Sequence, residues 1–194
     1  MSNDFYAFVS RMKYIDRWAL MRNTEEESLM QHSYEVAVVA HALAVISNKR
    51  LGKEIDADKV ALIALFHDTS EIITGDMPTP VKYYSPEITN AYKEVERVAT
   101  GKLLDMLPDD LRPEYESLLL PKEEDAELWK LCKAADKISA LIKCVEEQNV
   151  GNREFDKARE ATEAAIHSLN CEAAEIFLKE FLPSFSLTLD QLNK

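Results

Sequence analysis

Glycine is scarce in this chain, which has four glycines in 194 residues. Gly52, Gly75, Gly101 and Gly151 lie too far apart for any two of them to share a phosphate-binding loop. The glycine-rich fingerprints of dinucleotide-binding proteins and of P-loop proteins are therefore both absent. This absence excludes the binding of a nucleotide through a glycine-rich loop.

Positive charge is also in short supply. Lys and Arg together number 23 against 35 for Asp and Glu, which gives a net charge of −12. Such a field repels duplex nucleic acid and anionic bilayers, so we expect neither polymeric nucleic acid nor a membrane as a partner. A small anion can still be held by a few nearby cations, because the overall charge is largely screened by salt.

The chain has three cysteines and none of them forms a C-x-x-C pair, so the sequence predicts neither a disulfide framework nor a thiolate zinc site. Cys132, Cys144 and Cys171 are all expected to be reduced, and Cys132 and Cys144 to be packed in a helix. No run approaches the roughly 18 uncharged apolar residues of a membrane span, and residues 1–10 lack a signal pattern. We therefore expect a cytoplasmic protein.

Hydrophobic residues at 46% and charged residues at 30% are typical of a globular protein, and the length suits a single domain over residues 1–194. Helical periodicity runs through nearly all of the chain, which predicts an all-α fold. Helices are expected over residues 3–15, 24–48, 56–73, 85–107, 122–148, 154–169 and 171–181, with a short helix and turn in 108–120. Strand-like alternation is confined to residues 184–189.

Local signals set some of these boundaries. Thr24 has the spacing of a capping box, and the helix it opens is apolar nearly all round over residues 36–46, which indicates a central position. Asp56 caps the next helix, and Gly75 suits its end. Two prolines within residues 76–80 oppose a regular helix and predict an ordered, extended loop there.

The densest group of chemically active residues is His67-Asp68-Thr69-Ser70-Glu71, which follows an apolar run. Glu71 shares a helical face with both His67 and Asp68, because it lies four and three residues after them. A charged group at the end of a buried helix has to be paired or bound to a metal ion. A His-Asp pair near a helix end is nevertheless common as a capping or hydrogen-bonding pair.

Two further residues favour a metal site. His32 lies one turn inside the central helix on its apolar face, and Asp136 lies beside an apolar stripe of the long helix 122–148. His41 is turned by roughly 180° from His32, so it cannot serve the same site. We expect His41 to be a core or helix-contact residue and His167 to be a surface or packing residue.

The ordered set His32, His67-Asp68 and Asp136 resembles the signature of the HD-domain metal-dependent phosphohydrolases. Further stretches look like the bacterial 5'-deoxynucleotidases: Arg17-Trp18, residues 20–23, 31–33, 67–71, 74–83 and 181–185. The resemblance implies a helical HD-domain bundle with a mononuclear metal site between helices, and a homodimer. The C-terminal aromatic and apolar residues suit either a dimer contact or the monomer's own core: Phe177, Phe181, Phe185 and Leu187.

The same resemblance implies that His32, His67, Asp68 and Asp136 hold one divalent ion. Co²⁺ is the first expectation, with Mn²⁺ or another transition metal as alternatives, and two imidazoles with two carboxylates suit such ions. No histidine occurs between His67 and His167, which favours a single metal. Gln31 departs from the family, whose members often carry Glu before the first histidine.

The implied reaction is hydrolysis of a deoxyribonucleoside 5'-monophosphate, in which a metal-activated water attacks the phosphorus and Glu71 is the general acid and base. The resemblance assigns phosphate orientation to Arg17 and exclusion of a ribose 2'-hydroxyl to Trp18. It also assigns substrate contacts to Asp68, Asp76, Met77, Pro78, Thr79 and Asp136, with Asp76 accepting from the 3'-hydroxyl. Lys82 either adds positive potential or is simply solvated.

Some of these residues also suit an ordinary structural role. Trp18 also suits a core anchor of the first helix, and Glu71 an ordinary solvent carboxylate after a helix C-terminus. Two other functions remain open: another HD-domain nucleotide phosphohydrolase, acting on diphosphates or cyclic nucleotides, or a non-catalytic nucleotide sensor stapled by a metal ion.

Overall fold

The structure is a computed structural model that describes residues 3–82 and 84–193, without the side chain of Thr79. Its elements are, in order, α1 (Phe5–Val9), η1 (Ser10–Tyr14), α2 (Leu29–Arg50), α3 (Ala57–Phe66), α4 (Glu71–Thr74), α5 (Thr79–Lys82), α6 (Pro86–Leu104), α7 (Arg112–Leu119), η2 (Glu123–Asp125), α8 (Ala126–Asn149), η3 (Arg153–Phe155), α9 (Asp156–Ser168), α10 (Glu172–Glu180), η4 (Leu182–Ser186) and α11 (Leu189–Leu192). Over those residues no strand occurs, apart from one isolated antiparallel bridge between Asp16 and Ser28. The predicted all-α fold is confirmed.

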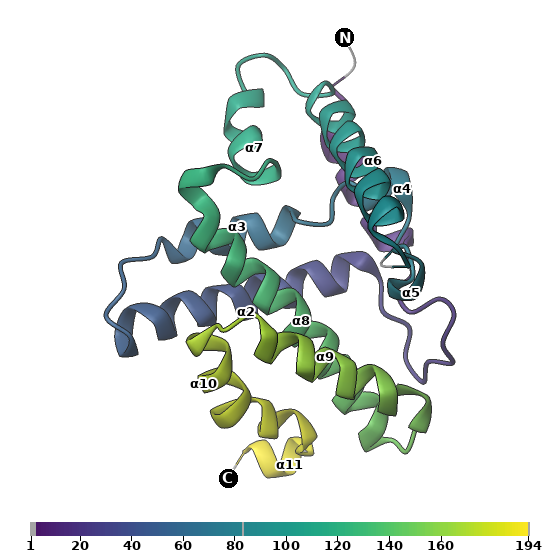
Figure 1. Ribbon diagram of the computed structural model, residues 1–194, viewed down its shortest axis with the longest axis vertical. Coiled ribbons are helices and arrows are strands. Elements are labelled where there is room, and N and C mark those ends of the chain that lie inside the picture. The colour runs from purple at the N-terminus through teal and green to yellow at the C-terminus, as the bar shows by residue number, and fades with distance from the viewer. Residues whose placement is uncertain (1–2, 83, 194) are drawn as a thin grey trace.

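Helices α2 and α8 form the centre of the main core. Helix α2 packs against α3 and α8, while α9 and α10 cover α8 and α2 from the C-terminal side (Figure 1). The largest fully buried side chains of this core include Leu43, Ile63, Ile138 and Ile142. Burial of each such side chain contributes roughly 1.5–3 kcal/mol to the stability of the fold. The helices that carry the candidate metal ligands are therefore held firmly in place.

A second, smaller cluster lies at the N-terminal end of the molecule. It joins Phe5 of α1 to Leu103 and Leu104 of α6 and to Leu119 of α7. In Figure 1, α6 runs beside the N-terminal segment with α4 and α5 next to it, away from the C-terminal helices α10 and α11. This second layer positions the short elements that border the candidate site.

Helix α2 begins later than the predicted residue 24. Its N-cap is Ser28, which forms a capping box with Gln31. The prediction for Thr24 was wrong because its amide and hydroxyl instead donate hydrogen bonds to Glu147, which is 123 residues away in the chain. The contact with Glu147 therefore prevents Thr24 from capping the helix.

The predicted helix over residues 56–73 is broken at His67. Asp56 caps α3 as expected, but the helix ends at Phe66 and α4 starts only at Glu71. The His67 ring and the Thr69 hydroxyl both donate to backbone carbonyls, to Ala64 O and Phe66 O respectively, each at 2.7 Å. These side chains occupy carbonyls that a continuing helix would use.

Three smaller predictions are corrected as well. Residues 3–15 divide into α1 and a 3₁₀ segment, and residues 184–189 run from the end of η4 to the start of α11 instead of forming a strand. Residues 75–78 are non-helical as expected, but helix α5 begins at Thr79. Proline is tolerated in the first turn of a helix, where no backbone N–H is needed. The later helices agree with prediction within a few residues.

Helix α2 has a length and composition that alone would allow it to cross a membrane, which the sequence analysis did not expect. Half of its most apolar window is buried in the protein, as befits the central helix of a core. All three cysteines, Cys132, Cys144 and Cys171, are free, as predicted, and all three are buried.

Candidate metal centre

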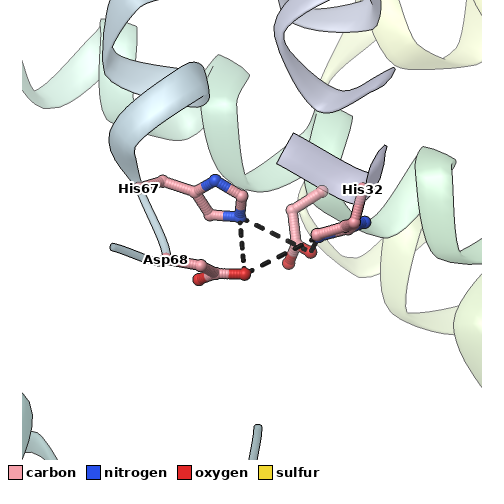
Figure 2. A group of neighbouring side chains, drawn as sticks. His32, His67 and Asp68 are labelled. Carbon is pink, nitrogen blue, oxygen red and sulfur yellow. Dashed lines mark ion pairs between the residues drawn. The ribbon is translucent and has the colours of Figure 1, made fainter. Parts of the chain in front are cut away.

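Three helical regions bring four potential ligands to one place. His32 lies near the start of α2, His67 and Asp68 directly follow α3, and Asp136 lies in the middle of α8. One ligand atom from each side chain lies within 4.8 Å of those of the others. Figure 2 shows His32 and the His67-Asp68 pair pointing toward one another from different segments of the chain.

The contacts within this cluster are short. His67 Nε2 lies 3.0 Å from Asp68 Oδ2, and His32 Nε2 lies 3.2 Å from Asp136 Oδ1. The cross distances are 3.7 Å from His32 Nε2 to Asp68 and 3.9 Å from His67 Nε2 to Asp136. Both Nε2 atoms are buried and lack a well-formed hydrogen bond within the protein. Two such nitrogens facing two carboxylates are a donor set that suits a transition-metal ion.

The other nitrogen of each imidazole has a defined partner. His67 Nδ1 donates to Ala64 O, and His32 Nδ1 lies 3.1 Å from Ser139 Oγ. The Ser139 hydroxyl donates in turn to Glu35 Oε2 at 2.6 Å, so its oxygen is free to accept from His32. These partners favour the tautomer in which each Nε2 presents a lone pair to the cluster, which is the arrangement that outer hydrogen bonds give metal-binding histidines.

The charges of the cluster are strongly coupled. Burial would raise the pKa of Asp136 and of Asp68, but the neighbouring imidazoles lower both, that of Asp136 well below its usual range. Burial and the charge of Arg17 lower the pKa of His32, whereas Asp68 raises that of His67 against the effect of burial. Two carboxylates thus face at most one imidazolium, and a cation would compete with that proton for His67.

Glu71 lies at the edge of the cluster, and its position differs from expectation. It is the first residue of α4, not a residue after a helix C-terminus, and its side chain is buried. Burial, with the negative charges of Asp68 and Asp76, raises its pKa to about 9. Lys82 Nζ lies 3.8 Å from Glu71 Oε1 while also pairing with Glu96 at 2.8 Å. The reading as a solvated carboxylate is therefore wrong, and Lys82 is not simply solvated.

Arg17 and Trp18 lie on the loop before α2. Arg17 Nη1 is 3.8 Å from Asp68 Oδ2, and only 11% of the Arg17 side chain is exposed. Burial alone would lower the pKa of Arg17, but Glu27 and the aspartates raise it. Trp18 packs against Phe155 of η3 with ring centroids 5.3 Å apart.

Asp76 belongs to the same electrostatic region. Burial raises its pKa while the positive charge of Arg17 lowers it, and Asp68 adds a further raising effect. Gly75, at φ +73°, turns the chain toward it, and the Tyr92 hydroxyl donates to Gly75 O. Met77 and Pro78 are half-buried next to Asp76, whereas the side chain of Thr79 lies outside the described part of the structure.

The remaining histidines stay out of the cluster. His41 is exposed, so its expected place in the core or at a helix contact is wrong. His167 is a surface residue as predicted, and its Nδ1 lies 2.8 Å from Glu175. The spacing argument that separated His41 from His32 agrees with the structure.

Four residues that support the site were missed by sequence reasoning. Glu35 and Ser139 each lie three residues after a cluster member, so the helical i, i+3 relation was an available signal. Glu27 and Glu147 had no such signal, because their partners are distant or lie in irregular backbone.

A helical bundle that holds a His, a His-Asp pair and a second Asp in this order defines the class of HD-domain phosphohydrolases. A solved HD-domain phosphohydrolase from Listeria innocua matches with a TM-score of 0.81 and 27% identity, over 98% of this chain and 92% of the other. The HD phosphohydrolase DatZ of cyanophage S-2L, solved with dA and one catalytic Zn²⁺, shares the fold with a TM-score of 0.65 at 19% identity, over 94% and 96%.

Comparison with protein families identifies a narrower group within that class. The model of the YfbR-like 5'-deoxynucleotidases matches residues 4–185. A 5'-deoxynucleotidase of Vibrio cholerae is 44% identical over 189 residues, and one of Shewanella oneidensis is 45% identical over 189 residues, with 97% of each chain covered in both comparisons. The chain belongs to the YfbR-like 5'-deoxynucleotidase family, as its resemblance implied.

Proposed function

We propose that this protein is a metal-dependent phosphomonoesterase that hydrolyses deoxyribonucleoside 5'-monophosphates to deoxynucleoside and phosphate. The observation that carries the proposal is the cluster of His32, His67, Asp68 and Asp136, with buried Glu71 and Arg17 beside it. Relatives that are named 5'-deoxynucleotidase and match nearly the whole chain support the substrate class.

His32, His67, Asp68 and Asp136 would hold one divalent ion, because all four offer a donor atom to the same small volume. We propose Co²⁺ first, with Mn²⁺ or another transition metal as alternatives. When bound, such an ion supplies Lewis-acid polarisation of a phosphate oxygen and a water of lowered pKa.

Glu71 is the proposed general acid and base. With its pKa raised to about 9, the carboxyl holds a proton at neutral pH, which it can give to the departing 5'-oxygen. After proton transfer, the carboxylate can accept a proton from water. Lys82 limits this shift by favouring the charged form.

Arg17 is the proposed phosphate-orienting residue, since a guanidinium can pair with two phosphate oxygens at once. Its Nη1 already faces Asp68, and we place Asp68 and Asp136 next to the substrate phosphate. Trp18 would border the sugar and exclude a 2'-hydroxyl. Asp76 would accept from the 3'-hydroxyl, with Met77, Pro78 and Thr79 completing that side.

We further propose that residues 1–194 act as one domain, that the protein is cytoplasmic, and that it forms a homodimer. Helix α3 contributes to both core clusters, which supports a single unit. Phe177 is buried in the main core, whereas Phe181 and Leu187 are exposed and available for a dimer contact.

The test is a phosphate-release panel with dAMP, dTMP and AMP in the presence of Co²⁺ or Mn²⁺. We expect much faster release from the two deoxynucleotides than from AMP. Equal rates on all three, or no release with any divalent metal, would contradict the proposal. Cleavage only of diphosphates or cyclic nucleotides would indicate another HD-domain hydrolase, and binding without turnover would indicate a sensor.

A further inference from the structure

One carboxylate oxygen holds both side chains that we place around the substrate on the loop before α2. Glu27 Oε2 accepts a hydrogen bond from Trp18 Nε1 at 2.9 Å and another from Arg17 Nε at 3.2 Å. The Glu27 and Arg17 side chains are 13% and 11% exposed, so these bonds are largely shielded from water. Shielding strengthens hydrogen bonds to a charged acceptor.

The backbone brings Glu27 to this place. Arg17 N donates to Glu27 O at 2.9 Å, and Leu29 N donates to Ile15 O at 2.8 Å, so the loop is closed at its base. Trp18 has φ +58°, a left-handed conformation that costs an ordinary residue about 1 kcal/mol or more. Such a conformation persists only where surrounding contacts hold it, and the bonds to Glu27 are among them.

The two bonds fix the two side chains differently. Glu27 occupies Nε of Arg17, while Nη1 of the same guanidinium lies 3.8 Å from Asp68. The Trp18 indole is held at its N–H by Glu27 and on its ring by Phe155. Two separate contacts define the plane of the indole.

We propose that Glu27 is a positioning residue that couples phosphate orientation by Arg17 to selection against ribose by Trp18. The inference rests on the proposed function. A side chain that rejects a hydroxyl by leaving it no room can do so only if it does not move. Glu27 itself touches no substrate and acts through its two partners.

The experiment compares Glu27→Ala and Glu27→Gln with wild type, and uses Glu26→Ala as a matched control from the same acidic run. Glu26 is exposed. The first measurement is kcat/KM for dAMP and for AMP with saturating metal. We expect Glu27→Ala to lower the deoxy-to-ribo ratio by about tenfold or more and to raise KM for dAMP. Glu27→Gln keeps an acceptor oxygen and should fall between Ala and wild type, while Glu26→Ala should match wild type.

The second measurement does not depend on turnover. The chain has two tryptophans, so a Trp129→Phe background leaves Trp18 as the reporter. We expect Glu27→Ala to shift Trp18 emission to longer wavelength and to increase its quenching by iodide. Circular dichroism checks that the variants are folded. If Glu27→Ala does not fold, the same two measurements on Glu27→Gln decide.

The proposal is overturned if Glu27→Ala keeps both the wild-type ratio and the wild-type Trp18 emission. It is also overturned if activity on dAMP and AMP falls equally, because that result indicates a merely structural role. Failure of the wild-type protein to hydrolyse or to discriminate nucleotides overturns the proposed function, and with it the selectivity half of this inference. The emission measurement then still decides whether Glu27 holds Trp18.

Discussion

The two sides of the candidate site are built in different ways. The four potential ligands lie on or directly after helices of the main core, where α2, α3 and α8 pack together. Arg17, Trp18 and Asp76 lie on irregular backbone that is held by individual hydrogen bonds and by residues at positive φ. Metal binding should therefore depend on the fold as a whole, and substrate selection on a few local contacts.

The largest effect should come from the helix-borne side. We expect His67→Ala to abolish stoichiometric metal binding and to lower kcat/KM by more than about a thousandfold, because one of the four proposed metal ligands is lost. Calorimetric titration with Co²⁺ measures the binding. Exposed His41→Ala is the matched control and should leave both quantities unchanged. Normal metal binding by His67→Ala would contradict the assignment of metal binding to the helix-borne side of the site.

Glu71 lies between the two sides, and Glu71→Gln should separate chemistry from binding. Loss of proton transfer lowers kcat by about 10²–10⁴-fold while metal still binds. The pKa of Glu71 is raised to about 9, so its proton is present below that pH and is lost as pH rises through it. Wild-type kcat should therefore fall at high pH. A pH–rate profile measures this, and the variant should lack that limb.

Glu147, near the C-terminal end of α8, forms hydrogen bonds with the loop that precedes α2. Its carboxylate accepts from Thr24, Asn152 and Lys143, which lower its pKa to about 2 against the effect of burial. A carboxylate with a lowered pKa stabilises the fold above its ordinary pKa, and this stability is lost as pH falls toward 2. Glu147→Gln should cost on the order of 3 kcal/mol of unfolding free energy at pH 7.

Urea unfolding at pH 7 and at pH 3 measures the effect, which should shrink at the lower pH. Glu94→Gln, which removes an exposed ion pair with Arg97, is the control and should change little at either pH. An equal loss at both values of pH would show that Glu147 does not stabilise the loop through its charge.

The smallest effect should come from an outer partner of the metal cluster. Ser139→Ala removes the bond to His32 Nδ1 and should weaken metal affinity by about 10–100-fold, with activity recovered at saturating metal. Metal titration monitored by thermal unfolding gives the affinity. Ser168→Ala, at an exposed site on α9, is the control. Activity that stays low at saturating metal would show that Ser139 does more than position His32.

The helix-borne half of the site was largely predictable because helical periodicity places each residue on a face. His32 and Asp136 were recognised from their apolar neighbours, and the structure brings both to His67 and Asp68. The loop-borne half was predicted only by resemblance. Hydrogen bonds such as those of Glu27 and Glu147 join segments whose proximity no spacing rule gives, and the same kind of contact moved the start of α2.

The meeting of His32, His67, Asp68 and Asp136 in one small volume has a consequence for the lifetime of the protein. An ion that binds only the folded chain adds RT ln(1 + [M]/Kd) to its stability, or about 2.7 kcal/mol at a hundred times Kd. Resistance to proteolysis should therefore rise with the supply of divalent metal. In a metal-poor cell the protein would become less abundant as well as less active.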